Sequence, residues 1–234
     1  MRFVAVKSER QQAAAGIHRV RELLMKQRTM LRNQIRGLMA EFGIVASKER
    51  GRFGALLAIL AEREDRRIPN PLREGLLASA ETLRTIERKL EAIDRQLVEA
   101  GRSDATYGHL ITVPGYGPIL SSAMAAMVTD PGAFRRSSDF AASLGIVPRQ
   151  EGTGGKLRLG PISKRGNGYL RRLLVNGAMS LINSKRAKSD PWLAKLLARK
   201  PRKVAAVALA NKLARIGWAL MTRQEDFRTM PAAA

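Results

Sequence analysis

A seven-residue leucine repeat constrains the fold of this chain more than any other feature of the sequence. Leu76, Leu83, Leu90 and Leu97 recur at intervals of seven residues, with Glu, Arg and Lys on the flanking positions. Such a repeat places the leucines along one stripe of a long helix and is typical of a coiled coil. The Asn-Pro pair at positions 70 and 71 predicts where this helix begins, because Asn caps helices well and Pro suits the first turn.

A second long helix is predicted upstream, from Ser8 to about Phe42. Ser8 and Gln11 form a capping-box pattern, and Gly43 is a typical stop. The apolar residues of this helix also keep a seven-residue spacing, and we expect them to form its seam: Ile17, Val20, Leu24, Leu31 and Leu38. The two long helices can pair within one chain or between two chains, and the sequence does not decide which. We expect the coiled coil to support a homo-oligomer.

Charge and composition narrow the partner classes. The net charge is +22 and the pI is near 11.4, which favours nucleic acid as a partner. The absence of cysteine excludes disulfides, a thiolate nucleophile and Cys-ligated zinc. His18 and His109 lie far apart in the sequence, and we interpret both as structural. No apolar run reaches the ~18 residues of a membrane span, so we expect no membrane partner and a cytoplasmic location.

The stretch from Pro148 to Arg172 combines high positive charge with many glycines. It holds seven basic residues, six glycines and a single acid, Glu151. Glycine allows close approach of the backbone to a ligand, while Lys and Arg supply charge, so the stretch predicts a loop that holds a polyanion ahead of a helix from Tyr169. A solvated basic connector is the alternative. The candidate nucleic-acid-binding residues here are Arg149, Lys156, Arg158, Lys164, Arg165, Asn167 and Arg171.

A second candidate contact is the Pro-Gly-Tyr-Gly-Pro run at positions 114 to 118. It separates an apolar lead from a helix rich in small residues, a pattern similar to a helix–hairpin–helix motif. In that motif the backbone N–H groups at a helix N-terminus contact a DNA phosphate without reading bases, and Gly115 and Gly117 would allow that contact. A tight helix–helix turn is the alternative interpretation.

Three segments in this order resemble a known family: VPGYGP, DFAASLGIVPRQ and GGKLRLGPISKRGNGYLRRLLVNGA. They are similar to the C-terminal domain of DEDD-type insertion-sequence transposases, the family that includes bridge-RNA-guided recombinases and pilin-gene invertases. The segment from Arg2 to Ile44 is similar to the family's connector between its two domains. The resemblance covers the chain from Arg2 to about Arg223.

The resemblance implies DNA as partner, a guide RNA as a further candidate partner, and two catalytic parts. A RuvC-like domain carries four acids that hold a divalent metal such as Mg²⁺, and the C-terminal domain supplies a serine nucleophile. This sequence departs from the pattern twice. The acidic quartet would lie upstream of Met1, so we expect no metal or other cofactor in this chain. The serine position reads Gly152-Thr153, which leaves Thr153 and Ser163 as the candidate catalytic hydroxyls.

We therefore predict a mainly α chain: a long coiled-coil helical hairpin, then a compact helical domain with a helix–hairpin–helix-like motif. The expected parts are a RuvC-like remnant (1–7), a coiled-coil connector (8–104), a C-terminal transposase domain (105–228) and a tail (229–234). The predicted function is that of a truncated insertion-sequence transposase, a DNA recombinase that binds DNA but is inactive alone. The alternative is a non-catalytic basic nucleic-acid-binding protein with a coiled-coil assembly element.

Overall fold

The computed structural model describes residues 5–45, 52–153 and 156–228, and over these residues the chain is mainly helical, as the sequence predicts. The chain divides into two compact units. We call residues 17–95 the hairpin unit, and residues 5–16 with 96–228 the C-terminal unit. The predicted tail and most of the predicted remnant lie outside the described residues. The predicted domain boundaries stay a prediction.

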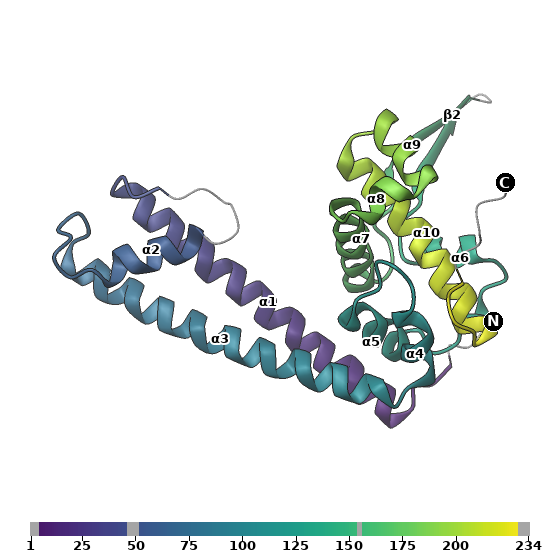
Figure 1. Ribbon diagram of the computed structural model, residues 1–234, viewed down its shortest axis with the longest axis horizontal. Helices are drawn as coiled ribbons and strands as arrows, with labels where there is room; N and C mark the ends of the chain where they lie inside the picture. The colour runs from purple at the N-terminus through teal and green to yellow at the C-terminus, as the bar shows by residue number, and fades with distance from the viewer. Residues whose placement is uncertain (1–4, 46–51, 154–155, 229–234) are drawn as a thin grey trace. The chain divides into compact units, whose positions relative to one another are not determined.

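Two long antiparallel helices build the hairpin unit (Figure 1): α1 (Glu9–Glu41) and α3 (Asn70–Arg102). They pair within one chain, because Arg21 Nε lies 2.5 Å from Asp94 Oδ1 and Arg32 Nη2 lies 2.6 Å from Glu87 Oε1. All four leucines of the repeat on α3 are buried. The pairing that the sequence left open is therefore intramolecular in this structure.

The seam predicted on α1 is only partly correct. Val20 is 53% exposed, whereas the fully buried side chains of α1 are His18, Ile35 and Met39. Toward the C-terminal end of α1, a third helix, α2 (Arg52–Ala61), packs against Ile35 and Met39 and helps to bury them. The core there comprises Ile35, Met39, Ile44, Phe53, Leu56, Leu60, Ile68, Leu76, Ala80 and Leu83.

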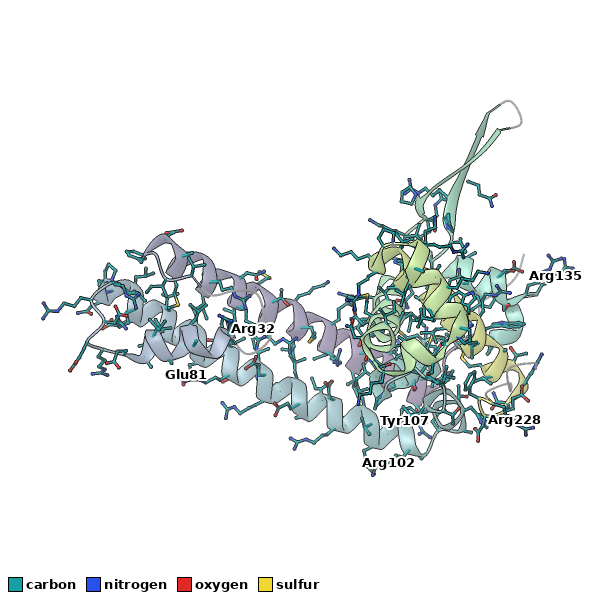
Figure 2. All side chains as sticks on the ribbon, turned by 45° about the horizontal axis from the view of Figure 1, so that its top comes forward. Arg32, Glu81, Arg102, Tyr107, Arg135 and Arg228 are labelled. Carbon is teal, nitrogen blue, oxygen red and sulfur yellow. The ribbon has the colours of Figure 1, made fainter. Side chains whose placement is uncertain are left out.

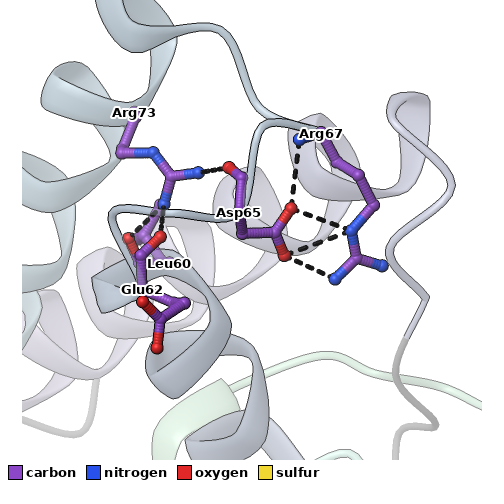
Figure 3. Close-up of polar contacts among 5 residues, drawn as sticks. All are labelled: Leu60, Glu62, Asp65, Arg67 and Arg73. Carbon is purple, nitrogen blue, oxygen red and sulfur yellow. Dashed lines mark hydrogen bonds and ion pairs between the residues drawn. The ribbon is translucent and has the colours of Figure 1, made fainter.

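A buried arginine closes the connection between α2 and α3 (Figure 3). Arg73 is 4% exposed, and its Nη1 donates to Leu60 O at 2.8 Å and to Glu62 O at 2.6 Å. Its Nη2 donates to the carbonyl of Asp65. These oxygens lie at and just beyond the C-terminus of α2, where helical carbonyls lack intrahelical partners. Arg73 therefore satisfies the end of one helix from the first turn of the next.

The C-terminal unit is helical around its last long helix, α10 (Arg202–Arg223). The other helices of the unit are α4 (Ala105–Ile111), α5 (Pro118–Met127), the 3-10 helix η1 (Pro131–Ala133), α6 (Ser137–Ser143), α7 (Gly168–Asn183), α8 (Arg186–Ser189) and α9 (Pro191–Arg199). Alanines and Gly217 dominate the buried face of α10 and allow neighbouring helices to approach closely. The side chain of Tyr107 on α4 lies against Gly101 at the end of α3, near the exposed Arg102 (Figure 2).

Helix α10 is also long and apolar enough to cross a membrane, by length and composition alone, and among the described helices it alone passes that test. Half of its most apolar window is buried within the unit. The helix contacts α7, α6 and α4 and carries the largest share of the core. These contacts are those of a core helix.

The glycine-rich basic stretch forms a β-hairpin, which corrects the loop predicted from the sequence. Strand β1 (Pro148–Thr153) pairs antiparallel with β2 (Lys156–Ile162). Between the pairs Pro148–Ile162 and Gln150–Leu159, Arg149 opposes two residues, Gly160 and Pro161, so β2 carries a bulge. A bulge tolerates Pro inside a strand, since Pro cannot donate to the ladder. This β-hairpin extends away from the helices of the C-terminal unit (Figure 1).

Candidate nucleic-acid interface

The Ser163–Gly166 segment, which follows β2, is attached to the turn after α6 by backbone contacts. Ser163 N donates to Val147 O at 2.9 Å, and Lys164 N donates to Gly145 O at 3.2 Å. Gly145 and Gly166 both have positive φ, +69° and +78°. The main chain of the segment therefore has little freedom to move relative to α6.

Steric contact makes glycine necessary at both of these positions. A Cβ added to Gly166 would lie 1.7 Å from Ser143 O, and one added to Gly145 would lie 2.1 Å from Arg165 O. Real Cβ atoms essentially never come within 3.0 Å of another heavy atom. The two backbones consequently meet at a distance that no other residue allows.

The side chains of this segment, unlike its backbone, face solvent. Lys164 and Arg165 are exposed, and in the part of the chain that the structure describes neither side chain takes part in an ion pair. Lys164 also holds a left-handed backbone, with φ of +56°. A rigid backbone thus presents two adjacent, unneutralised cations.

Arg171 makes two hydrogen bonds to backbone carbonyls of the same chain. Its Nη1 donates to Leu144 O at 2.8 Å and to Arg165 O at 3.0 Å. The guanidinium therefore connects α7 to the end of α6 and to the Ser163–Gly166 segment. Arg171 therefore helps to hold the segment in place, and the nucleic-acid contact predicted for it stays a prediction.

Asn167 caps α7. Its side-chain oxygen accepts hydrogen bonds from Tyr169 N at 3.0 Å and Leu170 N at 3.1 Å. These are amides at the start of α7, directly after the stretch that was predicted to hold a polyanion. They are already paired within the chain, so these two amides are not available to an anion while Asn167 caps the helix, and the nucleic-acid contact predicted for Asn167 stays a prediction.

The β-hairpin formed by β1 and β2 separates the two candidate nucleophiles. Thr153 pairs with Lys156 at the distal end of the two strands, whereas Ser163 follows Ile162 at the end nearest the helices. A strand rises about 3.3 Å per residue, so these positions lie roughly 20 Å apart. The structure does not bring them together. Arg149 is exposed on β1, and the side chains of Thr153, Lys156 and Arg158 lie outside what the structure describes.

The Pro-Gly-Tyr-Gly-Pro turn joins α4 to α5, and its first half packs inward. Tyr116 is buried, and its hydroxyl donates to Leu213 O at 3.1 Å. Burial raises the pKa of this hydroxyl well above its ordinary value. Gly115 has a φ of +92°, and a Cβ on Gly177 would lie 2.1 Å from Gly115 O. Gly115 is therefore a close-packing position against α7.

The second half of the turn faces outward. Gly117 is exposed, an added Cβ would meet nothing within 4 Å, and it caps α5 without a side-chain hydrogen bond. By contrast, Asp104 caps α4 and Asp190 caps α9 through their side chains. The first amides of α5 thus have no side-chain partner at the cap, while Gly115 supports the turn from within.

Neither histidine belongs to a metal-binding group. His18 is fully buried on α1, and His109 Nδ1 lies 2.8 Å from Asp226 Oδ1. Within residues 5–45, 52–153 and 156–228 no cluster of three or more His, Cys, Asp or Glu side chains has metal-binding geometry.

Several of these features were missed in the sequence, although parts of their signal were present. Lys156 to Leu159 alternate basic and apolar residues, and a Gly-Gly pair precedes them, which together are typical of a hairpin. The hydrogen bond of Arg171 to Leu144 O and the approach of Gly145 to Arg165 left no local signal. They connect segments that are about twenty residues or more apart in the sequence.

Comparison with known proteins gives one consistent result. A family model described as "Transposase IS116/IS110/IS902 family" matches residues 107–193, which include the turn before α5, the β-hairpin and the Ser163–Gly166 segment. A "Probable family 20 transposase" from Pseudomonas aeruginosa is 46% identical over 233 residues, covering 97% of this chain and 69% of the relative.

Two further relatives are named for insertion sequences. The "Transposase for insertion sequence element IS1328" of Yersinia enterocolitica is 38% identical over 97% of this chain and 68% of its own length. The "Transposase for insertion sequence element IS1111A" of Coxiella burnetii is 37% identical over 97% of this chain and 64% of its own length. The chain spans about two thirds of the length of these three relatives.

Proposed function

The chain belongs to the IS116/IS110/IS902 family of transposases, and from this premise we propose that its C-terminal unit binds the sugar–phosphate backbone of DNA during transposition of an insertion sequence. The observation that carries the proposal is the pair of exposed cations, Lys164 and Arg165, on a backbone fixed by Gly145 and Gly166. A rigid support reduces the entropy cost of each phosphate contact. Backbone contacts set register and supply affinity, while base edges supply sequence.

The N-terminus of α5 is the second phosphate contact in this proposal. Gly117 leaves the first amides of α5 without a side-chain cap, and helix N-terminal amides favour anions through both hydrogen bonds and the helix dipole. Arg149 on the β-hairpin adds a third exposed cation. The sequence assigned the same role to Lys156 and Arg158, and we keep them in the proposal on the strength of their charge.

The most direct test of this proposal is the salt dependence of DNA binding. Each phosphate contact contributes about 0.9 to the slope of log K against log salt on duplex DNA. Replacing Lys164→Gln and Arg165→Gln together should flatten the slope by about 1.8 and weaken binding to unrelated duplexes equally. The matched control is Arg102→Gln with Arg223→Gln, because both arginines are exposed and each pairs with a neighbouring carboxylate. An unchanged slope in the first variant would refute the proposal.

For strand cleavage, we propose that this chain alone binds DNA without cutting it. In support, the position that the family resemblance assigns to the serine nucleophile reads Gly152-Thr153 in this sequence. Supercoiled DNA incubated with the chain and Mg²⁺ should remain uncut and free of covalent protein. If an adduct forms, Thr153→Ala and Ser163→Ala identify the hydroxyl responsible, and the proposal of binding without cleavage is wrong.

The alternative function, a basic nucleic-acid-binding protein with an assembly element, is favoured by one observation. On α1, Val20, Leu23 and Met30 are 53%, 56% and 69% exposed, and they share one side of the helix. Such a stripe suits self-association, which would also serve a transposase. Val20→Lys with Met30→Lys should abolish concentration-dependent association in sedimentation.

Gel shifts with RNA and with DNA test the guide-RNA partner that the family resemblance implies.

A further inference from the structure

A second basic surface lies on elements that the proposed DNA contacts do not use. Residues 185–203 contain eight Lys and Arg and one acid, Asp190. The carboxylate of Asp190 accepts a hydrogen bond from Leu193 N at 3.1 Å, so it caps α9. Lys195, Arg199 and Lys200 take part in no ion pair within the described chain. The charges of these three side chains are therefore not neutralised by acidic groups of the described chain.

The geometry of α9 gathers part of this charge onto one stripe. Trp192, Lys195 and Arg199 are spaced three and four residues apart, so they lie on the same side of the helix, and all three are exposed. Leu193, on the opposite side, is fully buried in the core. Lys200 and Lys203 continue the exposed charge into the start of α10. The stripe therefore lies on the solvent-facing side of α9, and the burial of Leu193 holds the helix in this orientation.

Trp192 adds an exposed aromatic ring to this basic surface. Trp192 is 41% exposed, and Lys212 on α10 places its Nζ 4.2 Å from the centroid of the indole ring. Large aromatic side chains usually bury most of their surface, so a tryptophan left this exposed beside a lysine needs an explanation. The other tryptophan, Trp218, is partly buried and donates from Nε1 to Pro131 O at 2.8 Å.

We infer that the outward face of α9, formed by Trp192, Lys195 and Arg199 with Lys200, Lys203 and Lys212, binds unpaired nucleotides of a nucleic acid. A duplex keeps its bases stacked on one another, whereas an unpaired base can stack on an aromatic ring. Cations around the ring then contact the phosphates on either side of that base. Trp192 is partly exposed with Lys212 over one face of its ring, and Lys195 and Arg199 lie on the same side of α9. This combination of an accessible indole with exposed cations fits a single-stranded polynucleotide better than a duplex, which cations alone would serve.

The intrinsic fluorescence of the whole chain tests this inference directly. Stacking on a base quenches indole emission, and Trp192 and Trp218 are the only tryptophans in the sequence. Titration with a twelve-nucleotide oligothymidylate and, separately, with an oligouridylate of the same length should quench the emission. The oligonucleotide that binds more tightly shows whether the surface prefers single-stranded DNA or RNA. A duplex of the same length should quench much less. The Trp192→Phe chain, which retains only Trp218, should show no quenching by either strand.

Two sets of variants measure the affinity. Trp192→Leu, which keeps apolar bulk but not the aromatic face, should weaken binding of the single strand about tenfold, while Trp192→Phe should lose less. Lys195→Gln with Lys203→Gln should flatten the salt slope for the single strand by about 1.4, since each contact contributes about 0.7. Lys89→Gln with Arg84→Gln, on the exposed side of α3, is the control with the same charge change. Circular dichroism melts verify that each variant folds.

Several results would overturn the inference. These are equal quenching by duplex and single strand, unchanged affinity in Trp192→Leu, or a change in sedimentation of Trp192→Leu without a change in strand binding, which would indicate a protein interface. The inference is independent of the proposed DNA contacts, because Lys164→Gln and Arg165→Gln leave α9 intact. If Lys164→Gln with Arg165→Gln leaves the salt slope for duplex DNA unchanged while single strands still quench Trp192, only the proposed function is refuted.

Discussion

Gly166 gives the sharpest test of how the Ser163–Gly166 segment is held. Replacing it with Ala places a Cβ 1.7 Å from Ser143 O, whereas real Cβ contacts stay beyond 3.0 Å. The segment must therefore move by about 1.3 Å, the difference between these two distances. Such a shift disrupts the hydrogen bonds of Lys164 N to Gly145 O and of Arg171 Nη1 to Arg165 O.

The expected cost follows from these losses. The neutral backbone bond contributes about 0.5–1.5 kcal/mol and the charged one about 1.5–3 kcal/mol. A non-glycine residue in the left-handed region adds about 1–2 kcal/mol. We expect Gly166→Ala to lower the free energy of unfolding of the C-terminal unit by about 3–6.5 kcal/mol, the sum of these three contributions. Urea denaturation followed by tryptophan fluorescence measures this, since both tryptophans lie in that unit.

Gly166→Asn separates the two causes of that loss. Asn tolerates positive φ better than Ala does, but its Cβ occupies the same place. If contact with Ser143 O dominates, the two variants should differ by less than about 1 kcal/mol. Gly117→Ala, where the added Cβ meets nothing within 4 Å, is the control and should change stability little. The reasoning would be refuted by a Gly166→Ala chain that unfolds like the wild type, or by an Asn variant that restores most of the loss.

Three further predictions concern stability and pH. Tyr116→Phe removes the hydroxyl that donates to Leu213 O and should cost about 1 kcal/mol in urea denaturation at neutral pH. Because burial raises the pKa of Tyr116, its contribution is complete below pH 10 and is lost as the pH rises further, so wild type should lose more stability than Tyr116→Phe between pH 8 and pH 11. Arg73→Met leaves the carbonyls at the end of α2 without their donor and should destabilise the hairpin unit by about 2–4 kcal/mol, seen in the helical signal of circular dichroism. The hydrogen bond from Arg67 lowers the pKa of Asp65 to about 2, so its stabilising contribution is present above pH 3.8 and is lost as the pH falls toward 2; an NMR titration should show that midpoint, and Arg67→Ala should return it toward 3.8.

Helix starts were predictable because caps are local. Ser8 N donates to Gln11 Oε1 at 3.1 Å and Gln11 N donates to Ser8 Oγ at 3.2 Å, as the capping-box pattern predicts. The Asn-Pro pair likewise marks the start of α3 at Asn70. These signals involve residues within one turn of each other, so no distant partner needs to be known. The leucine repeat on α3 was equally reliable, because every one of its members faces the core.

Burial on α1 was less predictable from the residues alone. Several sides of this helix carry apolar residues, and Val20 and Ile35 have similar chemistry. Ile35 is buried because α2 and α3 lie against it, while Val20 has no such cover. Hydrophobic periodicity identifies a helix, but which stripe is covered depends on the partners that the fold brings to it.

The candidate interface shows the same division between local chemistry and distant contacts. Charge and glycine content, visible in the residues themselves, identified Lys164 and Arg165 as candidate phosphate contacts, and the fold leaves both exposed. Nothing local distinguishes Arg165 from Arg171, since both are arginines in one basic run. Only folding brings the carbonyls of Leu144 and Arg165 to the guanidinium of Arg171 and leaves that of Arg165 facing water. The function of a charge therefore depends on the backbone groups that tertiary packing places beside it.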